Sequence, residues 1–349
     1  MKINIFLNLT YIFTISMILS IFPSASMLTI NLDEHSSVDN TIVFTITNTS
    51  NIDINLSKKN IPYQNIISHN IFNIMTYNNT PIPYIGKLIK YNPNHTEYMI
   101  LEANESYSTD IHLSNYYDIP SNERVTILYK KDILEYEIKQ SVFSMFTSSK
   151  QRFFKALKKV GKVELKYNQC IQTQINIIND AKSLAYHISQ NAYHALMYAK
   201  DNTQAERYIT WFGSANVSRQ NHVKSSLKHI YDVLKEENIK FDCSCSEPYY
   251  AYVYPTDPYN IYLCSGFWNA ELSGTDSQSG TIIHQLSYFN KIAATKSYSF
   301  GEYEAKNLAI EFPNYTIINA DSYEYFTQNT PFLPMPDILA WLVPLLLNN

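Results

Sequence analysis

The sequence predicts an α+β protein in which an antiparallel β-sandwich is followed by a mostly α-helical domain with a small β-sheet. Residues 27–147 contain short stretches that alternate apolar and polar side chains, whereas residues 167–331 carry apolar side chains at helical spacing. The length of 349 residues agrees with two domains, at roughly 150 residues for each.

Alternation and β-branched side chains identify the strands of the first domain. The stretches MLTINL and TIVFTITNTS have both properties. Further candidates span residues 98–101, 108–113 and 125–129, with turns rich in Asn, Pro and Ser between them. Short strands at a spacing of roughly ten residues are typical of an antiparallel sandwich.

The second domain shows the period of amphipathic helices. Residues 171–199 form one long amphipathic stretch, and residues 217–237 form a second, with apolar residues at helical spacing. The aromatic stretch 251–263 is strand-like. We expect a helix around His284, then helices at about 302–312 and 318–328.

Residues 1–26 have the pattern of a secretory signal peptide. Lys2 gives a basic start, residues 12–22 are mostly apolar, and Ser24, Ala25 and Ser26 offer small side chains for cleavage. The apolar run is short for a membrane span, which needs ~20 residues. We therefore expect a secreted protein, with an uncleaved anchor as the alternative.

Two further segments depart in composition from the domains. Residues 148–166 are rich in Lys and Arg, and we interpret them as a linker. A membrane-surface helix and a solvated interdomain helix are the alternatives. Residues 332–349 form an apolar tail that is too short to span a bilayer. We expect it to pack on the second domain, with weak membrane association as the alternative.

All four cysteines lie in the second half of the chain, and an even number in a secreted protein predicts two disulfides. Cys243 and Cys245 are too close in sequence to pair easily with each other. The expected pairs are Cys170–Cys243 and Cys245–Cys264. Zinc binding by these cysteines is the alternative, although Cys-x-Cys departs from zinc-finger spacing.

The charge balance points to no nucleic-acid partner, because 27 basic residues face 31 acidic ones. The stretch GTIIHQLSYFNKIAATKSYSFG, residues 280–301, is more informative. His284 and Tyr288 share one helical face in it. A zinc peptidase uses His-Glu-x-x-His at such a place, with two imidazoles on the metal and the Glu as general base. In this chain Gln285 stands at the Glu position and Tyr288 at the second His position.

Residues 170–331 contain a dense set of further motifs: YITWFGS (208–214), FDCSC (241–245), YAYVYP (250–255), YLCSGFW (262–268), GTDSQSGTIIH (274–284) and NADSYEYF (319–326). In these motifs the residues resemble the fungal-type peptidyl-Lys metalloendopeptidases of the deuterolysin (aspzincin) family, and the first domain more weakly resembles that family's propeptide. The resemblance implies a zincin-like second domain and the same two disulfides.

The resemblance also assigns a role to each position of the site. His284 is the first metal ligand and is retained. Tyr288 and Ser297 replace the second and third ligands. Gln285 replaces the general-base Glu, and Phe300 replaces the Tyr that stabilises the oxyanion.

These replacements remove most of the chemistry. A neutral amide cannot take a proton from water, and a positioned general base contributes roughly 10²–10⁴ in rate. A phenyl ring cannot donate to an oxyanion, and one such donor is worth roughly 10²–10³. Catalytic zinc also needs about three protein ligands. Zinc is the family's cofactor, and the sequence predicts that this chain holds no cofactor.

The recognition residues are retained. The resemblance implies that Asp321 and Glu324, on the helix after the site, receive the lysine side chain of the substrate. Residues at i and i+3 face one direction and can bind an ammonium by charge-assisted hydrogen bonds. A solvated acidic face or a helix cap is the alternative.

Three hypotheses follow. The first is a secreted pseudoprotease that binds Lys-containing protein segments without cutting them, so that its partner is a protein or peptide with an exposed lysine. The second is an active zinc metalloendopeptidase with an unorthodox site. The third is a non-catalytic secreted scaffold.

Overall fold

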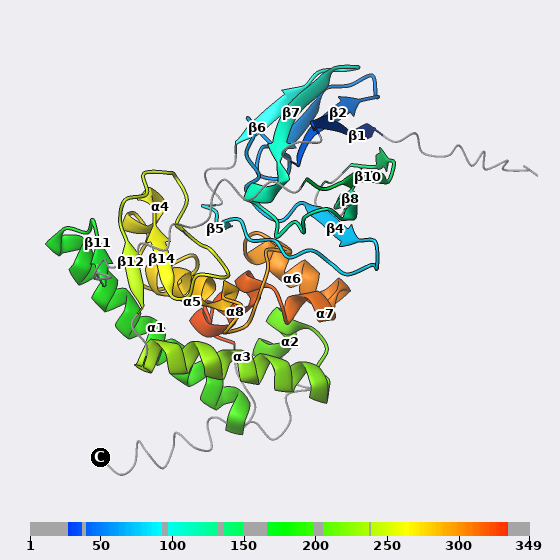
Figure 1. Ribbon diagram of the computed structural model, residues 1–349. Coiled ribbons are helices and arrows are strands. Elements are labelled where there is room, and N and C mark those ends of the chain that lie inside the picture. The colour runs from blue at the N-terminus through cyan, green and yellow to red at the C-terminus, as the bar shows by residue number, and fades with distance from the viewer. Residues whose placement is uncertain are drawn as a thin grey trace, which may run out of the picture.

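The computed structural model describes residues 27–36, 40–92, 97–131, 134, 136–148, 166–198, 205–236 and 239–333 (Figure 1). The expected signal peptide, nearly all of the expected linker and most of the apolar tail lie outside these residues. The domain boundaries therefore stay predictions. We call residues 27–148 the β-rich half and residues 166–333 the helical half.

The β-rich half contains ten strands among its described residues, and a short 3-10 helix, η2 (Leu113–Asn115). The strands are β1 (Leu28–Ser36), β2 (Thr41–Asn48), β3 (Ile54–Ser57), β4 (Phe72–Thr76), β5 (Leu88–Lys90), β6 (Tyr98–Leu101), β7 (Ser106–His112), β8 (Arg124–Tyr129), β9 (Ile138–Gln140) and β10 (Phe143–Phe146).

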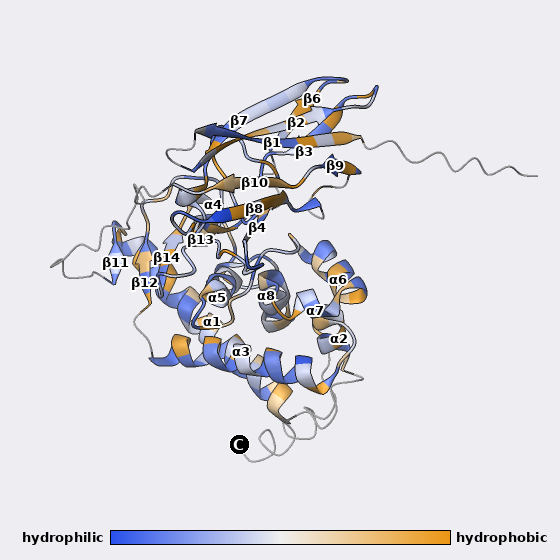
Figure 2. Cartoon of the chain, turned by 45° about the vertical axis from the view of Figure 1, so that its right-hand side comes forward, coloured by the Kyte–Doolittle hydropathy of each residue, from blue (hydrophilic) through white to orange (hydrophobic). Residues whose placement is uncertain are grey.

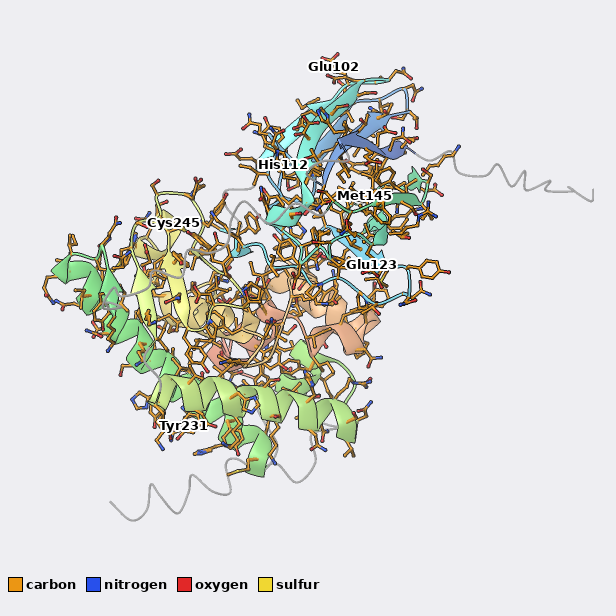
Figure 3. The ribbon with its side chains drawn as sticks, viewed as in Figure 1. Glu102, His112, Glu123, Met145, Tyr231 and Cys245 are labelled. Atoms are coloured by element: carbon orange, nitrogen blue, oxygen red, sulfur yellow. A yellow bond between two sulfur atoms is a disulfide. The ribbon has the colours of Figure 1, made fainter. Side chains whose placement is uncertain are left out.

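These strands form sheets in the orders β7-β2-β1-β9, β10-β8-β4 and β3-β6. All their pairings are antiparallel except the parallel pairing of β1 with β9. The alternating residues of β2 explain the layering, because Ile42, Phe44 and Ile46 are fully buried while the side chains between them are partly exposed. The sheets enclose a core of their own, in which Figure 3 labels Met145.

The helical half contains strands β11 (Tyr167–Asn168), β12 (Lys240–Asp242), β13 (Ala251–Val253) and β14 (Asn260–Leu263). Its helices are α1 (Gln172–Tyr198), α2 (Glu206–Phe212), α3 (Val217–Glu236), α4 (Ser265–Trp268), α5 (Gln278–Tyr288), α6 (Glu302–Glu311), α7 (Pro313–Thr316) and α8 (Ala320–Gln328). The predicted fold class is confirmed, with one refinement. The strand-like stretch 251–263 is a hairpin of β13 and β14, because Pro255 and Pro258 in the middle cannot donate to a ladder.

The apolar side of α3 faces the core, and its other side faces solvent. Val223, Leu227, Ile230 and Leu234 are buried at helical spacing, as their periodicity predicts. The visible side of α3 is mostly hydrophilic in Figure 2, and Figure 3 labels Tyr231 on this helix. Helices α5 and α8 lie further inside, and all residues of α5 are buried.

One strand of the β-rich half belongs to the sheet of the helical half. The sheet of the helical half has the order β11-β12-β14-β13-β5, so its last strand comes from the β-rich half. Strand β5 pairs antiparallel with β13, and Figure 1 shows it at the boundary between the halves. It was not predicted, because three residues are too few to show a period.

Both predicted disulfides are confirmed. Cys170 is bonded to Cys243, and Cys245 is bonded to Cys264. The first bridge ties the start of α1 to the end of β12. The second ties the loop after β12 to the start of α4, near the Cys245 label of Figure 3. These positions leave none of the four cysteines free to bind zinc.

Candidate functional site

Helix α5 places the retained histidine in the interior. The helix starts after Ser277, whose hydroxyl accepts a hydrogen bond from the backbone N–H of Gly280 at 3.1 Å. His284 and Tyr288 follow one turn apart on one face, and both are buried. The predicted helix that carries this pair is confirmed.

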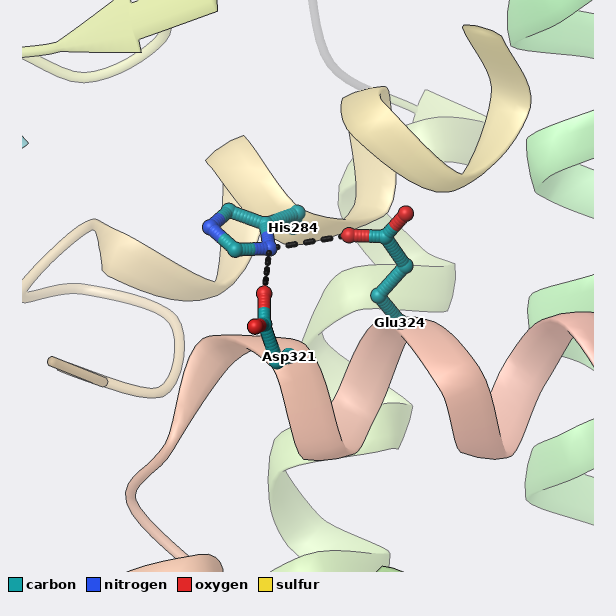
Figure 4. A group of neighbouring side chains, drawn as sticks. All are labelled: His284, Asp321 and Glu324. Carbon is teal, nitrogen blue, oxygen red and sulfur yellow. Dashed lines mark hydrogen bonds and ion pairs between the residues drawn. The ribbon is translucent and has the colours of Figure 1, made fainter. Parts of the chain in front are cut away.

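Helix α8 packs closely against α5 and supplies two carboxylates. A Cβ atom on Gly280 would lie 1.7 Å from the Gln328 side chain and 2.8 Å from Glu324 Oε1, so a larger residue there would displace these side chains. Asp321 Oδ1 lies 3.0 Å and Glu324 Oε2 lies 2.9 Å from His284 Nδ1. Figure 4 shows both carboxylates at the same ring nitrogen of the imidazole.

The three positions that carry metal ligands in the resembled family contact one another directly. His284 Nε2 lies 2.8 Å from the Tyr288 hydroxyl, and that hydroxyl lies 2.6 Å from Ser297 Oγ. Both are hydrogen-bond distances, so these three side chains bond to one another where the family has ligands of a metal ion. The replacement residues therefore form a continuous hydrogen-bonded chain.

Gln285 and Phe300, which replace the general base and the oxyanion donor, both make structural contacts. The Gln285 amide N–H donates to the backbone carbonyl of Ala251 at 3.3 Å, which ties it to β13. The ring of Phe300 packs edge-on against His69 and Tyr91 of the β-rich half, at centroid distances of 5.6 and 5.7 Å. Lys59 Nζ lies 4.1 Å from the centre of the Phe300 ring. Phe300 is therefore part of the contact between the two halves.

A lysine already occupies the acidic pocket. Lys90, the last residue of β5, places Nζ 2.6 Å from Glu324 Oε2 and 2.7 Å from Asp276 Oδ1. Lys90 is 3% exposed and Glu324 is 0% exposed, so both charges are removed from water. Asp321 lies on the other side of the pocket, where it contacts His284 and accepts from the Gly301 N–H at 2.7 Å.

Glu324 and Asp321 were predicted from the sequence as residues of the acidic pocket, whereas Lys90 and Asp276 were not. Asp276 belongs to the motif GTDSQSGTIIH, so its position just before the site helix could have identified it as a residue of the site. Lys90 offered none, because it lies 234 residues from Glu324 in the chain. Its role depends on the pairing of β5 with β13.

Burial and charge act in opposite directions on the pKa values of the site. Burial alone lowers the pKa of Lys90, but the attraction of Glu324 and Asp276 outweighs it and the net pKa is raised. Burial likewise lowers the pKa of His284, whereas its hydrogen bonds to Asp321 and Glu324 raise it, with a net rise. Burial raises the pKa of Asp321, but the contact with His284 lowers it overall. These contacts therefore favour the charged forms of Lys90, His284 and Asp321.

A cavity of about 180 Å³ lies between the halves at this site. Its walls include Lys59 and Tyr91 from the β-rich half and Ser299, Phe300 and Asp321 from the helical half. Both halves are therefore needed to enclose it.

The residues do not fit a catalytic zinc ion. Two of the three ligand positions carry neutral hydroxyl groups, which are weak ligands for Zn²⁺ beside Cys, His or carboxylate. Their oxygen atoms are already hydrogen-bonded to each other and to His284. On the opposite side of the imidazole, His284, Asp321 and Glu324 bring possible ligand atoms within 4.8 Å of one another. Lys90 bonds one of those atoms, so a metal there would have to displace its ammonium group.

Comparison with known proteins places the chain in a family. The family model of lysine-specific metallo-endopeptidases matches residues 197–328. An extracellular protease of Aeromonas hydrophila is 32% identical over 86% of this chain and 91% of its own length. The chain belongs to the lysine-specific metalloendopeptidase family. The predicted resemblance is thereby confirmed.

Other members extend the similarity. A peptidyl-Lys metalloendopeptidase of Armillaria mellea is 30% identical over 88% of this chain and 93% of its own length. Among solved structures, a zinc peptidase from Grifola frondosa is 34% identical, with a TM-score of 0.45, and covers 47% of this chain and 100% of its own. The family consists of zinc metalloproteases. Among the described residues, no helix combines the length and the apolar character that crossing a bilayer requires.

Proposed function

We propose that this member of the metalloendopeptidase family is a secreted pseudoprotease, which binds Lys-containing protein segments and does not cut them. The observation that carries the proposal is the hydrogen-bonded chain from His284 through Tyr288 to Ser297, at 2.8 and 2.6 Å. It stands where the family needs three metal ligands.

The absence of a general base supports the same conclusion. Gln285 is fully buried and its amide N–H is bonded to Ala251. A neutral amide has no lone pair basic enough to deprotonate water. Secretion is supported by the composition of residues 1–26 and by the extracellular description of the Aeromonas relative.

The pocket for a lysine side chain supports binding. Asp276 and Glu324 are placed to receive an ammonium group, and each lies within 2.7 Å of Lys90 Nζ. Buried carboxylates without such a partner would be costly. A pocket that is built around one lysine has the chemistry to accept another.

Elemental analysis of the purified protein tests the loss of catalysis. We expect well under one zinc per chain and no cleavage of Lys-containing peptides, because two ligands and the base are replaced. Stoichiometric zinc together with chelator-sensitive proteolysis in the wild-type protein would overturn the proposal and favour an active enzyme with an unorthodox site.

A restored variant provides the matched control for this measurement. It combines Gln285→Glu, Tyr288→His, Ser297→Asp and Phe300→Tyr on the same backbone. We expect it to bind about one zinc per chain, because it again has two imidazoles and a carboxylate. Zinc content is the readout, since it does not require that substrate reach the pocket.

A further inference from the structure

Helix α6 buries small side chains and exposes a large apolar one. Ala305 and Ala309 of this helix are buried, whereas Ile310 is 79% exposed. A helix on the surface of a globular protein normally turns its large apolar residues toward the core. The outward position of Ile310 is the reverse of that pattern, so its neighbourhood has the composition of a surface that something covers.

Two aromatic residues continue this apolar surface. Phe312, directly after α6, is 52% exposed, and Tyr315 of α7 is 47% exposed. Their ring centroids lie 6.1 Å apart, and the ring of Tyr298 lies 4.8 Å from that of Tyr315. We call Ile310, Phe312 and Tyr315 the outer apolar surface. Neighbouring large apolar side chains that are exposed together mark a place of contact with another segment or molecule.

The described part of the chain ends beside the helices that carry this surface. Helix α8 packs against α2 and α6, and Figure 2 shows α2, α6 and α7 side by side. Arg207 of α2 donates through Nε to the Phe326 carbonyl in the last turn of α8, at 2.8 Å. The N–H of Leu333, the last described residue, donates to Asn329 Oδ1 at 3.0 Å. The chain therefore leaves the helical half next to α2 and α6.

The residues that follow are the apolar tail. Phe332 at its start is exposed, and residues 338–347, ILAWLVPLLL, contain no charged side chain. Residues 334–349 reach roughly 50 Å when extended, at ~3.3 Å for each residue. The axes of two packed helices lie only about 8–10 Å apart. The tail is therefore long enough to pass α2 and reach the outer apolar surface.

We propose that residues 338–347 dock onto the outer apolar surface of the same chain and cover Ile310, Phe312 and Tyr315. The tail has no basic residue and a single acidic one, Asp337, so the contact depends on the burial of apolar area and not on charge. Docking removes two apolar groups from water at once, which keeps the chain from associating through either of them. It is separate from the proposed function, because it does not involve the cleft.

Two other occupants of the surface are less favourable. Attachment to a membrane surface through an apolar segment normally adds basic residues that attract anionic lipids. The tail has none, and the exposed Glu311 beside Ile310 would be repelled by such lipids. The tail of a second copy binds only at the concentration of the protein, whereas an attached tail acts at an effective concentration on the order of millimolar.

Photo-cross-linking in the full chain tests the contact. Trp341→p-benzoylphenylalanine places a photoreactive ring in the middle of the tail. After irradiation, the monomer is digested and mass analysis identifies the cross-linked peptide. We expect a cross-link to the peptide that contains residues 310–315 of the same chain. A cross-link to another part of the chain, or no cross-link, would overturn the proposal.

A double substitution on the surface tests the residues that carry the contact. Ile310→Glu with Phe312→Glu makes the surface polar, and we expect the yield of that cross-link to fall at least tenfold. Ile171→Glu is the matched control, because Ile171 is 65% exposed just before α1, and it should leave the yield unchanged. An equal yield in the double variant and the control contradicts the proposal. The position of the cross-link in the chain without these substitutions is read independently of them, so the test stands even if the double variant fails to fold.

Quenching of tryptophan fluorescence by iodide gives a second measurement without a photoreactive group. The difference between wild type and Trp341→Phe isolates the signal of Trp341 from that of the other two tryptophans. We expect Trp341 to be shielded from iodide in wild type and in Ile171→Glu, and to be quenched at least threefold more strongly in the double variant. A Trp341 that is equally quenched in all three proteins shows an undocked tail and overturns the proposal.

The same samples separate the three occupants. A cross-link that joins two chains at residues 310–315 assigns the surface to a second copy. Flotation with vesicles of phosphatidylcholine and phosphatidylserine that is lost in the double variant assigns it to a membrane. Either result overturns docking of the chain's own tail. A cross-link within the monomer, without flotation, supports it.

Discussion

Tyr288 decides the character of the site at the scale of single residues. Its hydroxyl group bonds His284 Nε2 on one side and Ser297 Oγ on the other. A histidine at this position would leave both of those atoms free to turn toward a metal. The tyrosine instead joins them, and its burial raises its own pKa so that it stays a neutral donor.

Replacing Tyr288 with Phe removes that connection without changing the ring. We expect a loss of about 1–3 kcal/mol in the free energy of unfolding, because the buried imidazole of His284 and the partly buried hydroxyl of Ser297 both lose a hydrogen-bond partner. Urea denaturation followed by tryptophan fluorescence measures it. Tyr303→Phe is the control, since Tyr303 is 74% exposed and should change stability by no more than ~0.5 kcal/mol. Equal effects of the two substitutions would show that the hydrogen-bonded chain contributes nothing.

At the scale of elements, the disulfides hold the sheet of the helical half to its helices. The Cys170–Cys243 bridge closes 73 residues and contains α1 and α3 within its loop, whereas the Cys245–Cys264 bridge closes 19. Longer loops lose more freedom in the unfolded chain when they are closed. The first bridge should therefore contribute more to stability.

Replacing each cysteine pair by alanine tests this order. We expect a loss of about 4 kcal/mol without Cys170–Cys243 and about 3 kcal/mol without Cys245–Cys264. All three tryptophans of the chain lie in or after the helical half, so their fluorescence reports its unfolding apart from that of the β-rich half. A larger loss from the shorter loop would show that native contacts, and not loop entropy, set the contribution.

At the scale of the whole molecule, the replaced catalytic position is part of the contact between the halves. Phe300 meets His69, Tyr91 and Lys59, all from the β-rich half. His69 is 3% exposed. Its burial, with the nearby charges of Lys130 and Lys59, lowers its pKa to about 3. The contact is therefore built around a neutral histidine.

A fall in pH should lower the free energy of unfolding, because His69 is held neutral in the folded protein. Because its folded pKa of about 3 lies below the ordinary 6.5, its contribution is complete above pH 6.5 and is lost as pH falls. Between pH 7 and pH 5 the loss is about 2 kcal/mol of unfolding free energy. Denaturant titrations of wild type and His69→Asn at pH 5, 6 and 7 give the free energy of unfolding. The loss appears as a steeper dependence of that free energy on pH in wild type.

The difference between the two proteins removes the contribution of all other titrating groups. His284 changes in the opposite direction over this range, because its pKa is raised and its contribution is complete below pH 6.5. That change is common to both proteins, so wild type should lose about 2 kcal/mol more unfolding free energy than His69→Asn between pH 7 and pH 5. Parallel curves would mean that His69 is not held neutral.

Local patterns in the sequence determined several strands and helices, the disulfide pairing and the helix of the site. The alternation in residues 41–48 predicted a half-buried strand, and apolar spacing in residues 217–237 predicted α3. All four cysteines lie in one half, and Cys243 and Cys245 are separated by a single residue. These two facts led to the correct disulfide pairing. The spacing of His284 and Tyr288 placed both on one face of a buried helix. Each of these patterns extends over a short stretch of the chain, so it can be detected in a single sequence.

Only the tertiary structure decided what the site contains. The sequence predicted a pocket formed by Asp321 and Glu324 for a lysine of another protein. The folded chain places its own Lys90 against Glu324 and Asp276, and turns Asp321 toward His284. The reason is that strand pairing depends on which sheet edge is free after the chain has folded. The edge of β13 is filled from 161 residues earlier in the chain (251 minus 90), and no local pattern encodes that choice.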